Sequence, residues 1–423
     1  MPNLILHRTV AVISDLHVAD PLDERLDDFD RDTDFERFLK VALPGRAGGP
    51  STLVINGDFI DFAQVLPEFG KHNAGERFGV TEDRSVTKLG RVLTGHSTVF
   101  RSLGEFIGDG NQVIILPGNH DIDFHWTQVF DALRTALGGP DESQLTFIKS
   151  GELHEQRIHI EHGNQYSYDN WFEHWTDPIR DAPDKRRRLE RPWGTLFLDL
   201  VYNSIEDLYP FVNKVYPHGM LAHIALRSFF DDERVSVGAL ARLAAFFVIK
   251  GKRFGWGRLL GDKRSPNAVP EDQSAAAFEK MLREIVPSAT PTRRREVATE
   301  LAALLPPPDA PPRVTKKGIR SGLLGRNDAR GIKKRQRDLL ESGDTTIVAF
   351  GHTHKPVDGN QRPPWGLEDP RRAFNTGSWM ARIPIGEEET PHWGELSKRQ
   401  QINDLRYLLI KLNPTPTATL ERL

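Results

Sequence analysis

The stretch TVAVISDLH (residues 9–17) decides the fold, because an apolar run of strand length ends directly in a turn that carries Asp15 and His17. The same arrangement recurs three times further along the chain. The later copies are TLVINGDFID (52–61), QVIILPGNHD (112–121) and TIVAFGHTH (346–354). Near-continuous apolar runs are typical of strands that are covered on both faces. The sequence therefore predicts a buried sheet whose strands each end in a polar turn.

The polar turns are expected to meet, since loops that leave the carboxyl ends of neighbouring strands converge on one rim of a sheet. Together with EHGN (161–164), they contribute seven candidate ligands: Asp15, His17, Asp58, Asn119, His162, His352 and His354. Imidazole and carboxylate together favour borderline divalent ions such as Mn, Fe, Zn or Co. Seven ligands are too many for one ion, so we expect Asp58 to bridge two ions about 3.5–4 Å apart.

In order and spacing these segments resemble the motifs of the calcineurin-like metallophosphoesterases: D-x-H, G-D-x-x-D, G-N-H-D/E, a lone His and G-H-x-H. Every position of that pattern has its counterpart in the chain. The resemblance implies an α/β fold, a four-layer α/β/β/α sandwich. It also implies one metal held by Asp15, His17, Asp58 and His354, and a second held by Asn119, His162, His352 and the shared Asp58.

The resemblance further implies a role for His120, which would protonate the leaving oxygen. Asp121 is expected to be its partner and to hold its tautomer. Asp61 is expected to brace the turn of Asp58 without binding metal. The segment NTGS (375–378) is predicted to form a tight turn near the site.

The composition indicates a soluble enzyme with an additional module. The chain has 423 residues, a net charge of −3 and no cysteine, which excludes disulfides. No secretory signal pattern opens the sequence. The longest apolar candidate, LAAFFVIK (243–250), is far shorter than the ~18 residues of a membrane span. We therefore expect a cytoplasmic protein that is at most peripheral to the membrane.

The family motifs require residues 1–165 and 345–423 but leave residues 166–344 as an insert. Apolar residues recur there at three- and four-residue spacings, which predicts helices. The helical stretches are GMLAHIALRSFFDD (219–232), QSAAAFEKMLREIV (273–286) and RRREVATELAALL (293–305). PPPDAPP (306–312) ends the last of them as a stiff break.

The insert is basic, with a net charge of about +7 against about −10 for the rest of the chain. Its positive residues cluster at 185–188, 250–258, 293–295 and 316–337. They are either solvated helix faces and loops, or a lid or platform for a polyanion, an anionic lipid surface or a nucleotide head group. The apolar stretch beside KGKRFGWGR (250–258) favours lipid, and aromatic residues interleaved on strands, which nucleic-acid readers lead one to expect, are absent.

The sequence thus predicts a metal-dependent phosphoric ester hydrolase with two divalent transition-metal ions, Mn first, with Fe, Zn, Co or Ni as alternatives. Its substrate would be a phosphomonoester, phosphodiester or diphosphate, in a small molecule or a lipid. Within the family the chain is similar to the bacterial enzymes that cleave UDP-2,3-diacylglucosamine, although its insert is longer and His120 stands where theirs usually carry Arg. Two alternatives are a nuclease that uses the insert as a strand platform and a non-catalytic binding module.

Overall fold

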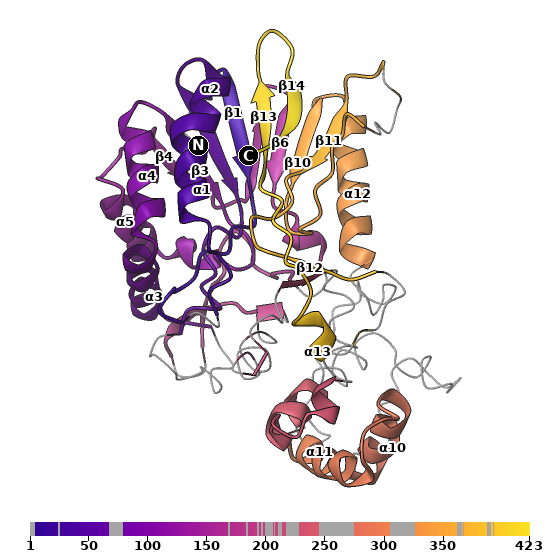
Figure 1. Ribbon diagram of the computed structural model, residues 1–423. Coiled ribbons are helices and arrows are strands. Elements are labelled where there is room, and N and C mark those ends of the chain that lie inside the picture. Colours follow the sequence, from indigo (N-terminus) through magenta and orange to yellow (C-terminus); the bar gives the residue numbers. More distant parts are fainter. Residues whose placement is uncertain are drawn as a thin grey trace. The chain divides into compact units, whose positions relative to one another are not determined.

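The computed structural model in Figure 1 describes residues 5–423 with gaps. Outside the description are residues 1–4, 24–25, 67–78, 168–169, 183–184, 193, 196–197, 199–205, 207, 210–213, 217–227, 245–274, 305–325, 362–365, 367, 387–390 and 392. The basic stretch 250–258, the Pro-rich break 306–312 and most of the apolar stretch 243–250 lie outside the described residues, as do residues 219–227 of the first predicted insert helix.

The chain divides into two compact units, neither of which is continuous in sequence. The first unit comprises Met1–Leu196, Asp328–Ala381 and Asn403–Leu423, and the second comprises Phe197–Asn327 and Arg382–Ile402. The first unit therefore takes in both ends of the insert expected over 166–344. The second unit also includes a segment from the C-terminal part of the chain.

The first unit contains a six-stranded mixed sheet, in the order β14-β13-β1-β2-β3-β4. Its strands are β1 (Thr9–Ile13), β2 (Ser51–Asn56), β3 (Gln112–Leu116), β4 (Leu145–Phe147), β13 (Arg406–Lys411) and β14 (Thr417–Arg422). Strands β1 to β4 are parallel, and β13 pairs antiparallel with both β1 and β14. The parallel strands all end at the same edge, which gathers their turns.

A second mixed sheet, in the order β11-β10-β6-β5, supplies the remaining predicted motifs. Its strands are β5 (Glu152–Glu155), β6 (Ile158–Glu161), β10 (Ile347–Phe350) and β11 (Arg372–Asn375). Strand β10 runs parallel to β6 and β11, whereas β5 is antiparallel to β6. EHGN and GHTH therefore leave their strands in the same direction, side by side.

Alternating side chains of the strands explain how the sheets are covered. Ala11 and Ile13 of β1 pack in a core with the helices, whereas Val10 and Val12 pack in a core that includes residues of the second sheet. The helices of the first core are α1 (Asp32–Arg37), α2 (Leu43–Ala47), α3 (Glu82–Gly95), α4 (Ser97–Gly108) and α5 (Thr127–Ala136). Both faces of β1 are buried, as the apolar run predicts.

Helix α12 (Arg326–Glu341) covers the other side of the second sheet (Figure 1). Ile332 and Leu340 of this helix pack with Val348 and Phe350 of β10. The first unit is therefore a mixed α/β structure with two mixed sheets flanked by helices. A hairpin of β7 (Ile179–Asp181) and β8 (Arg187–Leu189) follows the second sheet's β6 in the chain.

The second unit has its own core around α10 (Ala275–Ile285), α11 (Pro291–Leu304) and α13 (Trp393–Leu396). Its two-stranded parallel sheet pairs β9 (Val215–Tyr216) with β12 (Ile383–Pro384). Helices α10 and α11 occupy the stretches that the sequence predicts as helical. Arg293 and Arg294 of the basic cluster 293–295 donate to backbone carbonyls within this unit. In the part of the chain that the structure covers, no helix has both the length and the apolarity to span a membrane.

Candidate metal centre

The polar turns at the strand ends share an unusual backbone. Five predicted ligand residues adopt positive φ: Asp15 (55°), His17 (55°), Asp58 (52°), His352 (64°) and His354 (56°). Residues other than glycine rarely occupy this left-handed region, and doing so costs on the order of 1–2 kcal/mol per residue. Strain of this kind persists where surrounding structure over-determines it, which is common at functional sites.

Hydrogen bonds between the turns hold that backbone in place. The Asp15 N–H donates to the Gly57 carbonyl at 3.1 Å, and the His17 N–H donates to the Asp58 carbonyl at 2.9 Å. The His352 N–H donates to the Asp15 carboxylate, at 3.0 Å and 3.1 Å from its two oxygens. Residues from both ends of the chain thus meet, as the strand pattern predicts, but their turns leave two sheets rather than one, since β10 belongs to the second sheet.

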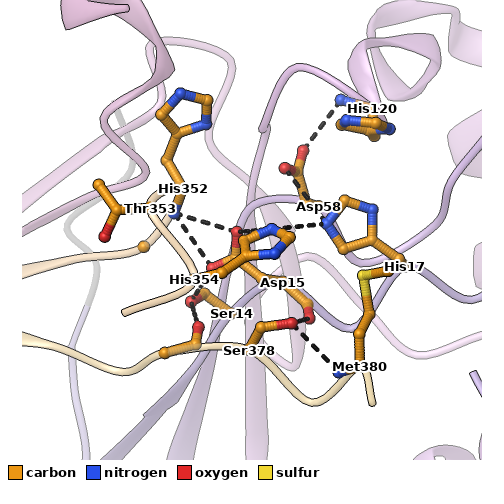
Figure 2. Close-up of polar contacts among 12 residues, drawn as sticks. Ser14, Asp15, His17, Asp58, His120, His352, Thr353, His354, Ser378 and Met380 are labelled. Atoms are coloured by element: carbon orange, nitrogen blue, oxygen red, sulfur yellow. Dashed lines mark hydrogen bonds and ion pairs between the residues drawn. The ribbon is translucent and has the colours of Figure 1, made fainter. Parts of the chain in front are cut away.

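The first group of side chains comprises Asp15, His17, Asp58 and His354, whose ligand atoms all lie within 4.8 Å of one another. His354 Nε2 is 3.2 Å from both His17 Nε2 and Asp15 Oδ1. Figure 2 shows these three side chains directed toward one another. All four residues are buried. Two imidazole nitrogens that face each other beside two carboxylates form a donor set suited to a divalent ion.

The second group comprises Asp58, His162 and His352. His162 Nδ1 lies 2.8 Å from the Asn56 carbonyl, which directs Nε2 at Asp58 Oδ2, 3.0 Å away. Burial opposes a charge on this ring, but Asp58 and Asp15 raise the pKa of His162 to about 10, so a metal ion at this position would have to displace the Nε2 proton. The same Asp58 oxygen is 3.7 Å from His17 Nε2. Asp58 is therefore the residue common to both groups, in the position expected of a bridge.

Asn119 is buried beside the shared carboxylate. Its Oδ1 has no hydrogen-bond partner among the described residues. The preceding Gly118 runs so close that a Cβ there would lie 2.2 Å from Asp58 Oδ1. A buried amide oxygen without a donor is costly unless something binds it, and a metal ion is one such partner. The residues present therefore fit the two-ion arrangement that the sequence predicts.

The contacts of His120 correct one expectation. Its Nδ1 lies 2.8 Å from Asp61 Oδ2, an oxygen that is also 2.9 Å from His17 Nδ1. The Asp121 carboxylate instead accepts the backbone N–H groups of Phe59 and Gly118, at 2.8 Å and 2.6 Å. The predicted pairing of Asp121 with His120 is wrong, because Asp121 is committed to bracing two loops. Asp61 is the carboxylate that contacts His120.

Electrostatics favours a protonated His120. Burial disfavours the imidazolium, but Asp61 and Asp58 outweigh that penalty and raise the pKa of His120 to about 9. His352 shows the opposite balance, since burial and the neighbouring His162 lower its pKa to about 3. His352 is thus neutral and offers a lone pair, whereas His120 carries a proton to donate.

The segment 375–378 braces the site, although it forms no regular tight turn: Asn375 is the last residue of β11, and the chain bends at Gly377, whose φ is 80°. The Asn375 amide donates to the Gly351 carbonyl at 2.7 Å and accepts the Gly377 N–H at 2.9 Å. Ser378 Oγ donates to the Asp15 carbonyl at 2.9 Å. Sequence reasoning missed Ser14 and Thr376, whose hydroxyls lie behind Asp15. Their position inside the SDLH and NTGS segments was the only signal.

Comparison with known proteins agrees with this geometry. Residues 8–198 match the model of the calcineurin-like phosphoesterase family. The matched part includes Asp15, His17, Asp58, Asn119 and His162, whereas His352 and His354 follow later in the chain. The two mixed sheets flanked by helices are consistent with the metallophosphoesterase fold. A search of curated proteins found no match.

Proposed function

We propose that this protein is a metal-dependent phosphoric ester hydrolase with two divalent transition-metal ions. Asp15, His17, Asp58 and His354 would hold one ion, and Asn119, His162, His352 and the shared Asp58 would hold the other. The fold would be the four-layer α/β/β/α sandwich of the family. When bound, the ions would polarise a phosphoryl oxygen and activate water as the nucleophile.

The observation that carries the proposal is the position of Asp58 Oδ2. It lies 3.0 Å from His162 Nε2 and 3.7 Å from His17 Nε2, between one imidazole of each group. Both nitrogens are buried, so neither can be satisfied by bulk water. A carboxylate between two sets of imidazole donors supports a bridging role more directly than any other contact in the site.

His120 is suited to protonate the leaving oxygen. Its side chain is 15% exposed, against 5% for Asp61 and 5% for His17, so a substrate can reach it while its partners stay covered. Asp61 contacts Nδ1, which leaves the Nε2 proton for transfer. Neutralising the departing alkoxide in this way completes cleavage of the phosphorus–oxygen bond.

The proposed substrate is a phosphorylated small molecule or lipid with a phosphomonoester, phosphodiester or diphosphate bond. Its support is the match of residues 8–198 to the calcineurin-like phosphoesterase family and the net positive charge of the residues between the motifs. Manganese is the first ion to test, because the mixed imidazole and carboxylate set suits it and its neighbours in the transition series.

Hydrolysis of p-nitrophenyl phosphate and bis(p-nitrophenyl) phosphate tests the proposal. Chelated and dialysed protein should be inactive on both compounds, and added Mn²⁺ should restore turnover of at least one. His352→Ala should recover much less activity than the wild type at the same Mn²⁺ concentration. Activity that survives chelation would contradict a metal-dependent reaction, and loaded protein that cleaves neither ester would favour a binding module.

A further inference from the structure

We propose that the hydroxyls of Ser14 and Thr376 position Asp15 by occupying one of its two carboxylate oxygens, so that the other is presented to the first metal. Both are positioning residues, since they would act through Asp15. The inference rests on the proposed function, because it concerns the ligand set of that same metal centre.

The two hydroxyls form a short chain behind Asp15. Ser14 Oγ donates to Asp15 Oδ2 and lies 2.5 Å from Thr376 Oγ1. Ser14 and Thr376 are 0% and 1% exposed, so water does not compete for these contacts. The Gly377 carbonyl is a weaker alternative acceptor for Ser14, at 3.3 Å.

The number of hydroxyl protons determines which group donates in each of these hydrogen bonds. Each hydroxyl has one proton to donate and two lone pairs to accept with. The anionic Asp15 oxygen is the stronger acceptor for Ser14, since charge-assisted hydrogen bonds are roughly twice as strong as neutral ones. Thr376 is then left to donate to Ser14 Oγ. A donor that is itself hydrogen-bonded in this way binds the carboxylate more strongly.

The other carboxylate oxygen faces the candidate ligands. Asp15 Oδ1 lies 3.2 Å from His354 Nε2, within the group that includes His17 and Asp58. The His352 N–H is shared between both Asp15 oxygens, so it does not distinguish them. Ser14 does distinguish the two oxygens, because its hydroxyl donates to Oδ2. The hydroxyl chain therefore selects Oδ1 as the metal ligand and disfavours rotation of the carboxylate.

Packing leaves room for the Ser14 hydroxyl and holds Thr376 in position. A Cβ at Gly351 would lie 2.7 Å from both Ser14 Oγ and Asp15 Oδ2, so a side chain at that position would displace the hydroxyl. The Thr376 N–H donates to the Phe350 carbonyl at 3.2 Å. The segment after β11 thus holds Thr376 against Ser14, and Figure 2 shows Ser14 between that segment and Asp15.

Binding of a single ion can be measured in a His352→Ala parent, in which the group of Asp15, His17, Asp58 and His354 stays complete. Metal-free protein would be titrated with Mn²⁺ by calorimetry and with Co²⁺ by its visible absorption spectrum. Adding Ser14→Ala should weaken Mn²⁺ binding about 10–100-fold and change the Co²⁺ spectrum, as loss of a ligand's hydrogen-bond partner typically does.

Thr376 provides a matched pair of variants. Thr376→Val removes the hydroxyl at nearly constant volume and should weaken Mn²⁺ binding in the same direction, whereas Thr376→Ser keeps the hydroxyl and should restore the parent affinity. Ser102→Ala is the folding control, because Ser102 is equally buried but donates to Val99 in α4. If Ser14→Ala fails to fold, the Thr376 pair decides the question alone.

The outcomes separate this inference from the function on which it rests. A parent that binds no ion would overturn both. A parent that binds Mn²⁺ with an affinity unchanged by Ser14→Ala and by Thr376→Val would overturn the positioning role and leave the proposed function standing. Weaker binding in Thr376→Val together with recovery in Thr376→Ser would support the hydroxyl chain.

Discussion

At the scale of single residues, Asp58 is the side chain that the two candidate ligand groups share. Its Oδ2 lies near His17 and His162, and its Oδ1 accepts the His120 N–H at 2.9 Å. One side chain therefore links both candidate metal positions to the loop of the proposed acid.

Asp58→Asn should reduce kcat more than the loss of any terminal ligand. Removing the shared charge weakens the hold on both ions, and we expect a loss of about 1000-fold, or about 4 kcal/mol. His17→Ala and His352→Ala, assayed with the same esters and Mn²⁺ concentration, are the comparison. An Asp58→Asn variant as active as either would mean that the bridge is misassigned.

His120→Ala should lower kcat about 10²–10⁴-fold for an alkyl phosphate but much less for p-nitrophenyl phosphate, whose leaving group needs little protonation. Metal content should not change, because His120 belongs to neither of the two proposed ligand sets, although it forms a third group of possible ligands with His17 and Asp61. Steady-state kinetics on the two esters, with metal analysis of each sample, provides the test. Equal losses on both esters would argue that His120 only orients the phosphate.

Asp61→Asn should shift the alkaline limb of the kcat profile to lower pH. The acid form of His120 is active, so kcat falls as pH rises through its pKa, which the Asp61 carboxylate raises against the opposing effect of burial. Without the Asp61 charge that pKa decreases toward the ordinary value for histidine. The profile should be recorded at saturating Mn²⁺, since Asp61 also contacts His17. If the alkaline limb of the kcat profile did not move, the ionisation behind it would belong to a group other than His120.

At the scale of elements, the sequence predicted best where a strand is buried on both faces. The runs before SDLH, NGDFID, GNHD and GHTH correspond to β1, β2, β3 and β10. Strands β13 and β14 were not predicted, and β14 is an edge strand in which Ala418 alone is buried. The partner of His120 was also missed, because the contacts of Asp61 and Asp121 depend on how two separate loops pack.

His96 links elements that the motifs do not mention. It lies between α3 and α4, with Nδ1 2.7 Å from Asp32 and Nε2 3.1 Å from Asp27. Burial opposes its charge, but the two carboxylates raise the pKa of His96 to about 9. The folded pKa exceeds the ordinary value of 6.5, so the stabilisation is complete below about pH 6.5 and is lost as pH rises through about 9.

His96→Gln should therefore destabilise the protein most at pH 6 and least at pH 10. We expect a loss on the order of 2 kcal/mol in the free energy of unfolding at pH 6. Urea titrations at both pH values measure it. The exposed His174, which pairs with Glu190 near the surface, is the matched control, and His174→Gln should cost much less. A pH-independent loss at His96 would indicate packing alone.

At the scale of the whole molecule, the motifs located the metal centre but not the division of the chain. The second unit recruits residues 382–402, whose Trp393 packs against Tyr209 and Phe229. No sequence motif indicates that residues 382–402 belong to the second unit, because their place there depends on apolar contacts between segments far apart in sequence. The candidate ligands span residues 15 to 354, so bound ions would join distant parts of the first unit.

Counting the ions most directly tests the central claim that Asp58 bridges two metals. Metal-free protein titrated with Mn²⁺ should bind two ions per chain, and its midpoint of thermal unfolding should rise as they bind. The Asp58→Asn variant should lose both tight binding events, whereas His352→Ala should lose one. Saturation of the wild type at one ion per chain, or two tight ions in Asp58→Asn, would contradict the account.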